Sequence, residues 1–309
     1  MIQAFLIFCF SLFLVIKGAT LSTRYADKLA KSYHLSKYTV GFIIIAIISI
    51  LPEAFVSINS SLQGVPDFGL GTLFGSNIAD LTLIFAILVF FTGRNLKVES
   101  KIIKNHTIYP FILLIPLIFG LNGHFSRIEG LVLVIIGAIF YYTTIKREAG
   151  EPIIAYKPKN RWKNFIFLFG SMAILLAGSY FTVNSATLLA EKIGINPVLI
   201  GMLIVGLGTT MPELFFSLES LKRNDDSLAI GDLLGTVLAD ATILVGILAL
   251  INPFSFPPRI VYVTGVFMVV AAFMLLHFMR SGKTLTKKEA FVLFVFWVIF
   301  VLVEFFVNK

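Results

Sequence analysis

The sequence contains little charge, one cysteine and no polar segment as long as a domain. Charged residues make up 14% of the 309 residues, compared with about 25% in an average soluble domain. Cys9 is the only cysteine, which excludes an intrachain disulfide and a metal site built from cysteines. The net charge of +8 does not indicate nucleic-acid binding, because that function needs a basic face on a folded soluble module. The composition therefore excludes an ordinary soluble protein.

Apolar runs of about 20 residues, long enough to cross the hydrocarbon core of a bilayer, recur along the whole chain. The first run, residues 2–16, has no basic segment before it and is followed by Lys17, so we interpret it as a membrane helix and not as a cleaved signal peptide. We predict an all-α integral membrane protein without a soluble domain. Ten transmembrane helices are expected at residues 2–20, 39–62, 68–92, 107–122, 128–145, 164–190, 197–221, 228–252, 258–279 and 288–306.

Basic residues are distributed unequally between the two sides of this helix arrangement. Only Arg127, Lys192, Arg259 and Lys309 lie on one side, and the other 21 of the 25 Lys and Arg residues lie on the opposite side. Because Lys and Arg are retained on the cytoplasmic side, we expect both termini to be extracellular and the protein to lie in the plasma membrane. The polar stretch at 147–163 is predicted to be a cytoplasmic linker.

The chain repeats itself at an offset of 160 residues, without a gap. Residues 41–82 and 201–242 share 13 identical positions, including a Pro-Glu pair and a glycine-rich segment that ends in Asp. We therefore expect a first repeat at 1–146 and a second at 164–309. Since each repeat holds five predicted helices, an odd number, the second must enter the membrane from the opposite side. Inverted repeats are typical of alternating-access transporters with a substrate site near the bilayer midplane.

Four acidic residues fall well inside the predicted helices: Glu53 and Asp80 in the first repeat, and Glu213 and Asp240 in the second. A carboxylate at that depth costs at least several kcal/mol unless it is paired, protonated or bound to a cation. No Lys or Arg is expected at a similar depth. The four acids therefore predict a site for a cation, for protons, or for both in turn.

Oxygen donors accompany these acids. Pro52 and Pro212 have no amide hydrogen, which frees the carbonyls of Ile48 and Gly208. Ca2+ prefers carboxylate, carbonyl and hydroxyl oxygens, whereas a zinc or copper site would use nitrogen or sulfur. We predict a calcium site without a cofactor. Hydroxyl residues near the acids are further candidate ligands: Ser49, Ser57, Ser76, Thr209, Thr210, Ser217 and Thr236.

Other titratable residues in the apolar segments are interpreted differently. Asp232 lies about two turns before Asp240, near the predicted cytoplasmic end of its helix, and is a candidate residue of a vestibule. Glu219, His277 and Glu304 lie toward helix ends and are expected at the membrane interface.

The segments ILPEAFVS and GTLFGSNIAD resemble the first signature repeat of the calcium/cation antiporter superfamily, and GLGTTMPELFFS and GDLLGTVLAD resemble the second. The resemblance is closest to prokaryotic sodium/calcium exchangers and extends over the whole chain. It implies an antiporter, not an enzyme, that exchanges Ca2+ for Na+ while helices 1 and 6 slide across the core. It also implies central Ca2+ ligands at Glu53 and Glu213 and carbonyl ligands at Ser49 and Thr209. The cation sites would be completed by Ser76, Asp80, Thr236 and Asp240.

Two positions depart from the family pattern. Ile50 stands where the family usually has Ser, which removes a hydroxyl expected to bind Na+, and Asp80 stands where the family often has Asn. The extra acid can carry a proton or bind further cation charge. Two couplings therefore remain open, exchange of Ca2+ for Na+ and exchange of Ca2+ or another divalent cation for H+.

Two other classes of protein share some of these features. An intramembrane aspartyl protease would also need two buried Asp residues, but it would normally show Tyr-Asp and Gly-x-Gly-Asp motifs, and neither occurs here. A passive calcium channel is more often an oligomeric ring, whereas two inverted repeats in one chain favour alternating access.

Overall fold

The computed structural model describes residues 2–30, 50–98, 108–148 and 161–307, nearly all of them helical. Eight helices in these ranges are long and apolar enough to cross a membrane, so the chain is a multi-pass membrane protein. They span Ile2–Ser22, Pro66–Thr92, Arg127–Thr144, Trp162–Ile193, Pro197–Lys222, Asp226–Ile251, Ile260–Arg280 and Lys287–Val307. Two of the ten predicted helices are not among these eight. Tyr109–Asn122 is a shorter apolar helix, and α4 (Leu51–Leu62) begins next to the undescribed residues 31–49.

Several helices extend beyond their predicted ends. α1 (Ile2–Ala30) continues ten residues past the predicted end at residue 20, and α9 (Arg127–Glu148) and α10 (Arg161–Ile193) both reach into the predicted linker. Charged residues mark where a chain leaves the hydrocarbon, but Lys, Arg and Glu are good helix formers, so they do not end a helix. The sequence prediction ended each helix where the apolar run ended, whereas the helices continue past the membrane boundary.

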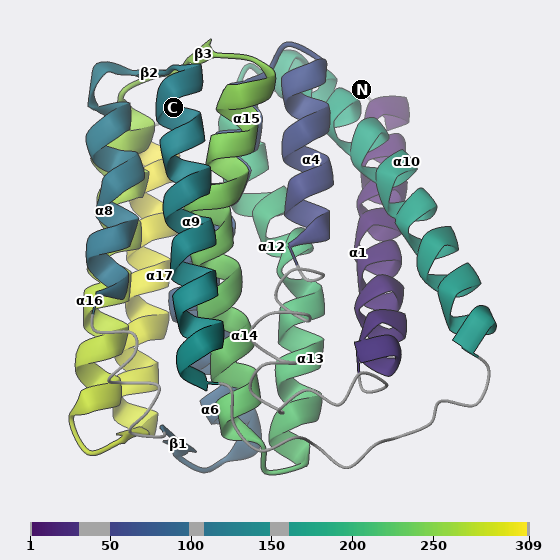
Figure 1. Cartoon of the computed structure of the whole chain (residues 1–309). Helices are drawn as coiled ribbons and strands as arrows, with labels where there is room; N and C mark the ends of the chain where they lie inside the picture. The colour runs from purple at the N-terminus through teal and green to yellow at the C-terminus, as the bar shows by residue number, and fades with distance from the viewer. Residues whose placement is uncertain (1, 31–49, 99–107, 149–160, 308–309) are drawn as a thin grey trace.

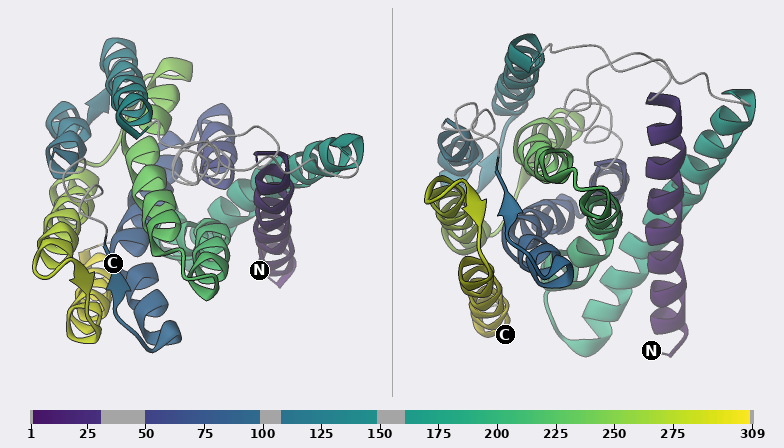
Figure 2. Two further views of the ribbon diagram at one scale, coloured as in Figure 1. Left: turned by 60° about the horizontal axis from the view of Figure 1, so that its bottom comes forward. Right: turned by 90° about the horizontal axis from the view of Figure 1, so that it is seen from below.

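Two composite helices occupy the centre of the bundle. One consists of α5 (Pro66–Ala79), η2 (Asp80–Ile84) and α6 (Phe85–Thr92). The other consists of α14 (Asp226–Ala239), η5 (Asp240–Leu244) and α15 (Val245–Ile251). Within an apolar stretch of 18 residues in each helix, 83% is buried by the surrounding protein in the first composite helix and 78% in the second. In α17 (Lys287–Val307) only 22% of such a stretch is buried. The outer helices α16 (Val266–Arg280) and α17 lie at one edge of the bundle, yellow-green to yellow in Figure 2.

Both central helices widen into a π-helical turn at an aspartate. The turns η2 and η5 begin at Asp80 and Asp240, 160 positions apart. In each turn a threonine hydroxyl donates to the carbonyl four residues earlier, from Thr82 to Ile78 and from Thr242 to Leu238. Single π-helical turns occur often at functional sites.

The first central helix touches a broken helix of the second half of the chain. That helix consists of α11 (Pro197–Ile200), η4 (Gly201–Val205), α12 (Gly206–Thr209) and α13 (Met211–Lys222). A Cβ at Gly75 would lie 2.1 Å from the carbonyl oxygen of Met202, and a Cβ at Gly206 would lie 3.0 Å from the amide nitrogen of Ser76. Only glycine permits this backbone contact, which places Ser76 beside α12.

α1 and the inclined α10 form a pair at one side of the bundle (Figures 1 and 2). A glycine lies on each helix at the crossing, and a Cβ at either would come within 3.0 Å of the partner backbone. These glycines, Gly18 and Gly178, are 160 positions apart. Two hydroxyl pairs join the helices, with Ser22 Oγ donating to Ser171 Oγ and Thr182 Oγ1 donating to Ser11 Oγ, each at 3.0 Å.

Two short antiparallel sheets close opposite ends of the bundle. β1 (Leu96–Lys97) pairs with β4 (Thr284–Leu285), and β2 (His124–Phe125) pairs with β3 (Phe254–Ser255). Figure 1 shows β1 at the lower end and β2 with β3 at the upper end. The upper sheet lies beside η3 (Gly120–Asn122), which follows α8 (Tyr109–Phe119). The next helix after β3 starts as η6 (Ile260–Gly265) and continues as α16.

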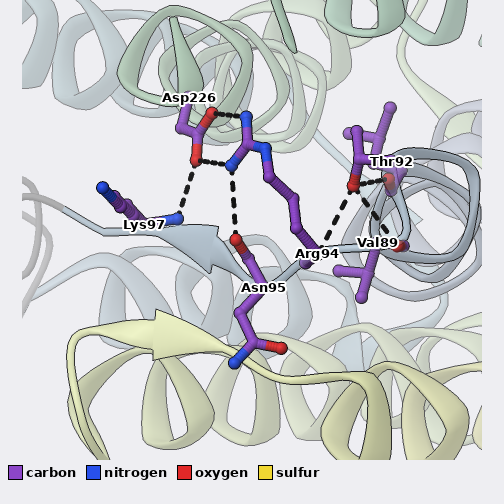
Figure 3. Close-up of polar contacts among 7 residues, drawn as sticks. Val89, Thr92, Arg94, Asn95, Lys97 and Asp226 are labelled. Carbon is purple, nitrogen blue, oxygen red and sulfur yellow. Dashed lines mark hydrogen bonds and ion pairs between the residues drawn. The ribbon is translucent and has the colours of Figure 1, made fainter. Parts of the chain in front are cut away.

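An ion pair lies beside the lower sheet (Figure 3). The guanidinium of Arg94 donates to both carboxylate oxygens of Asp226, at 2.7 and 2.6 Å, and the amide of Lys97 donates to the same carboxylate at 2.8 Å. The hydrogen bond that Arg94 donates to Asp226 raises the pKa of Arg94. The pair joins the segment after α6 to the first turn of α14.

The upper sheet is flanked by aromatic rings, whereas the lower sheet is flanked by the ion pair. Phe125 contacts the rings of Phe254 and Phe256, with centroids 5.8 and 5.1 Å away. Phe254 is the residue 160 positions after Arg94.

Candidate cation site

Glu53 and Glu213 lie in the first turns of α4 and α13, each directly after a proline. In the second half, α12 ends at Thr209 and α13 starts at Met211, so the helix is interrupted immediately before Pro212. Because Pro212 has no amide hydrogen, it cannot close the helical bond to the Gly208 carbonyl. The structure thus places a carboxylate beside an interrupted backbone, as the sequence predicted.

The described candidate ligands are all buried, with at most 1% of each residue exposed to solvent. They are Glu53, Ser57, Ser76, Asp80, Thr209, Thr210, Glu213, Ser217, Thr236 and Asp240. Ser49 lies outside the described residues. Burial of this many polar groups inside an apolar bundle is costly unless they bind something.

No residue that the structure describes donates a hydrogen bond to either oxygen of the four carboxylates, which are Glu53, Asp80, Glu213 and Asp240. Within the described ranges, the hydroxyls of Ser57, Ser217 and Thr236 also have no hydrogen-bond partner. No Lys or Arg among the residues that the structure describes is buried. The positive charge that these acids require must therefore come from outside the described part of the protein.

These acids act on one another electrostatically. Asp80, Glu213 and Asp240 each lie close enough to Glu53 for negative charges on these groups to repel one another. The Thr209 hydroxyl lies beside Glu53, and the Ser76 hydroxyl lies beside Asp240. Each half of the chain thus supplies a hydroxyl to an acid of the other half.

The threonine and serine hydroxyls keep their oxygen lone pairs available. Thr209 donates its hydrogen to the Gly206 carbonyl, Thr210 to Leu207 and Ser76 to Leu73, each at 3.0 Å. A hydroxyl whose hydrogen bonds back to its own helix can still offer its oxygen to a cation.

The structure does not gather all the acids around one point. In the described ranges, no three carboxylate, imidazole or thiol groups lie close enough together to hold one metal ion. A single cation would therefore be held by one or two carboxylates together with hydroxyl and carbonyl oxygens. Such a mixed oxygen shell suits Ca2+, which takes six to eight oxygen ligands in flexible geometry.

Asp232 corrects the sequence interpretation. Sequence position suggested a vestibule residue, but the side chain is fully buried and lies within Coulombic reach of Asp80 and Glu213. The signal was present, because Asp232 shares a helix face with Thr236 and Asp240. Its depth depends on how far α14 is covered by neighbouring helices, which the sequence does not state.

Glu304 lies near the end of its helix and is covered by protein. Only 2% of it is exposed, and it accepts a hydrogen bond from the Thr264 hydroxyl. Glu219 and His277 are exposed, and Glu219 pairs with Arg223 at 2.8 Å. The position of these three residues at the membrane interface stays a prediction.

Comparison with known proteins gives a match along nearly the whole chain. A family model described as "Sodium/calcium exchanger protein" matches residues 3–146 and 163–306. The chain is 24% identical to sodium/calcium exchanger MaX1 of Methanosarcina acetivorans over 351 residues, covering 98% of this chain and 99% of that protein. It is 25% identical to inner membrane protein YrbG of Escherichia coli K12 over 262 residues, covering 80% and 79%.

A solved structure has the same fold. The sodium-calcium exchanger NCX_Mj, soaked with Na+ and Sr2+, aligns with a TM-score of 0.71 and 23% identity, covering 96% of this chain and 97% of that chain. The same protein soaked without Na+ and Ca2+ aligns with a TM-score of 0.68.

Proposed function

Because the chain belongs to the sodium/calcium exchanger protein family, we propose that it exchanges Ca2+ for Na+ by alternating access. The observation that carries this proposal is the set of four buried carboxylates without hydrogen bonds or buried basic partners in the described ranges. The two exchanged cations would neutralise these acids in turn. The family is one of transporters, not enzymes.

The proposed architecture is ten helices in two inverted repeats, residues 1–146 and 164–309, joined by a cytoplasmic linker at 147–163. Three pairs of elements support it, because α4 and α13, α5 and α14, and η2 and η5 have bounds that differ by 160. The two sheets support it as well, since β2 and β4 are also 160 apart and lie in sheets at opposite ends of the bundle (Figure 1).

In this proposal Glu53 and Glu213 are the central ligands of Ca2+. Thr209 and Ser49 would contribute backbone carbonyls, and the hydroxyls of Thr210 and Ser76 would add further oxygens. The remaining cation ligands would be Ser57, Asp80, Ser217, Thr236 and Asp240. Burial of the described members supports this assignment, as do the hydroxyls of Thr209 and Ser76, which lie beside Glu53 and Asp240 of the other half.

α1 and α10 are the proposed moving elements. They pack closely on one another and are joined by two hydroxyl pairs. Each pair is the repeat equivalent of the other, because Ser171 and Thr182 lie 160 positions after Ser11 and Ser22. A pair joined symmetrically can slide past the buried core as one body and open either end of the site in turn.

The proposed orientation places the β1 end in the cytoplasm and both termini outside, in the plasma membrane. The first turn of α1 and the last turn of α17 lie at the opposite end from β1 (Figure 1). Single cysteines placed at 147–163 on a Cys9→Ser background should react with an impermeant thiol reagent only from the cytoplasmic side. Labelling from outside would reverse the orientation.

A second coupling, of Ca2+ or another divalent cation to H+, is favoured by Ile50 and Asp80. Ile50 is 7% exposed and offers no oxygen where Thr210 does in the other half, and Asp80 adds a titratable group. The acids that bind the divalent cation would then carry protons on the return step.

Uptake of radiolabelled Ca2+ into proteoliposomes, under separately imposed Na+ and pH gradients, tests the proposal. Uptake driven by an outward Na+ gradient supports Na+ exchange, and uptake driven only by a pH gradient supports the second coupling. Downhill Ca2+ flux that neither gradient can drive uphill would contradict antiport.

A further inference from the structure

Glu304 is a buried acid that the cation site does not use. It lies on α17, three residues before the helix ends at Val307. Its carboxylate accepts a hydrogen bond from Thr264 of η6, and the Thr264 residue is fully buried. Phe300, one turn earlier on α17, packs on Phe267 with ring centroids 5.5 Å apart. An acid in such surroundings indicates a functional role.

Several described elements that pack on α17 carry titratable groups. The elements that pack on α17 are α6, η2, η6 and α16. α6 has no titratable residue, and Asp80 of η2 lies in the cation site near Glu53. Tyr262 of η6 donates to the Leu121 carbonyl. His277 and Arg280 of α16 lie at the far end of that helix, near the start of α17.

One cation lies close by. Arg259, directly before η6, donates from Nη1 to the carbonyl of Val307 at 3.2 Å, one turn beyond Glu304. The carboxyl group of Glu304 can exist with or without its proton, and the two forms make different hydrogen bonds with Thr264.

The Thr264 hydroxyl has one hydrogen and two acceptors. It donates to Oε1 of Glu304, and its oxygen lies 3.7 Å from the sulfur of Met202. When Glu304 is a carboxylate, it takes the hydrogen of Thr264. When Glu304 carries a proton, its own O–H can donate to the Thr264 oxygen, and the Thr264 hydrogen becomes available to the sulfur. Protonation therefore reverses one hydrogen bond and changes the contact with Met202.

Met202 lies where two helices of the cation site touch. Its carbonyl faces Gly75, directly before Ser76, and its own broken helix carries Thr209 and Glu213. Because the backbones are in contact there, a changed side-chain contact at Met202 acts on the spacing of these helices.

We propose that Glu304 is a proton-binding site separate from the cation site, and that Thr264 transmits its protonation through Met202 to the helix that carries Glu213. The ligand is a proton from the aqueous phase at the Val307 end of α17. Proton binding itself does not depend on the proposed exchange, whereas its effect on flux does.

Infrared difference spectroscopy of the purified protein in lipid nanodiscs tests proton binding directly. As the pH falls, the wild type should gain a protonated-carboxyl band that Glu304→Gln lacks. Thr264→Val should shift the frequency of that band, and Thr264→Ser should restore it. Glu219→Gln removes an exposed acid and serves as the control. Identical carboxyl bands in the wild type and Glu304→Gln would overturn the proposal.

Transmission is tested by Ca2+ uptake at equal pH on both sides, with only a Na+ gradient imposed. Glu304→Gln should lose part of the pH dependence of the rate. Thr264→Val should move the midpoint of that part upward by about one pH unit, because the hydrogen bond that the carboxylate loses is stronger than the one that the neutral acid loses, and Thr264→Ser should match the wild type. If Glu304→Gln does not fold, the Thr264 variants carry the test. Wild-type profiles in all variants would overturn transmission, and absence of wild-type Ca2+ uptake would contradict the exchange proposal but not the infrared result.

Discussion

The two halves of the chain place the same backbone around the site but surround it with different polar groups. α5 and α14 have matching bounds, and each leads into a π-helical turn at an aspartate. α14 alone carries a further buried acid, Asp232, where α5 has Thr72. It is also held by hydroxyl groups, because Tyr109 donates to the Leu234 carbonyl at 2.9 Å and Tyr141 to Gly235 at 2.7 Å.

The positions equivalent to those tyrosines are Val269 and Val301, which have no hydroxyl. The proposed cation ligands are thus nearly symmetric, and the tyrosine contacts to α14 are not. Alternating access needs two similar half-sites, but nothing requires both halves to be held equally. α14 thus has two hydroxyl contacts that the equivalent positions of the other half cannot make, and it carries one buried acid at a position where α5 has Thr72.

The largest effect is expected where the halves are alike. Glu53→Gln and Glu213→Gln should each abolish Ca2+ transport, because either change removes a ligand charge from a buried cation. Uptake into proteoliposomes measures the loss, and size-exclusion chromatography verifies folding. Transport near the wild-type rate in both variants would remove these residues from the site.

Asp232→Thr makes α14 resemble α5 and should weaken Ca2+ binding by at least about tenfold. Two unit charges attract each other by about 4 kcal/mol at 4 Å for an effective dielectric constant near 20, a divalent cation doubles this attraction, and about 1.4 kcal/mol already corresponds to a tenfold change in affinity. Calorimetric titration with Ca2+ measures the change. Glu219→Gln removes one exposed charge and should leave the affinity unchanged, so an equal loss in both variants would indicate a general charge effect.

Coupling should respond to changes that make the first half resemble the family pattern. Ile50→Ser adds a hydroxyl oxygen and should strengthen the Na+ dependence of uptake about twofold to tenfold, since one added ligand contributes about 0.5–1.5 kcal/mol. Asp80→Asn should reduce uptake driven by a pH gradient. Flux across a matrix of Na+ and pH gradients measures both. A wild type that is driven fully by Na+ and insensitive to pH would make Ile50 a tolerated substitution only.

The smallest effect is expected at the ion pair of the lower end. Arg94→Gln leaves Asp226, whose side chain is 8% exposed, without its bidentate partner, which should cost about 1–3 kcal/mol and lower the unfolding temperature. Arg223→Gln breaks a pair whose side chains are 63% and 55% exposed and should cost under about 1 kcal/mol. Equal shifts in thermal unfolding would show that the Arg94 pair does not anchor α14.

Much of this molecule could be predicted from its sequence because the relevant signals are local. Apolar runs predicted the membrane helices, and the acids Glu53, Asp80, Glu213 and Asp240 stood out because a charge inside such a run is costly. The family resemblance drawn from the Pro-Glu and glycine-rich motifs is confirmed by the match along the chain.

What sequence could not supply depends on contacts between distant helices. Glu304 lies near the end of its helix, and only the packing of α17 against η6 shows that it is buried. The polar anchors of α14 come from residues more than 90 positions away, such as Tyr141 to Gly235. The long charged extension of α1 carries no local stop signal at residue 20, so its end was misplaced.

The location of the bound cation tests the central claim most directly. Crystals soaked with Sr2+, a divalent cation that scatters anomalously, should show a peak between the carboxylates of Glu53 and Glu213, and the peak should disappear in Glu213→Gln. A peak elsewhere in the protein, or one that persists unchanged in Glu213→Gln, would contradict the account.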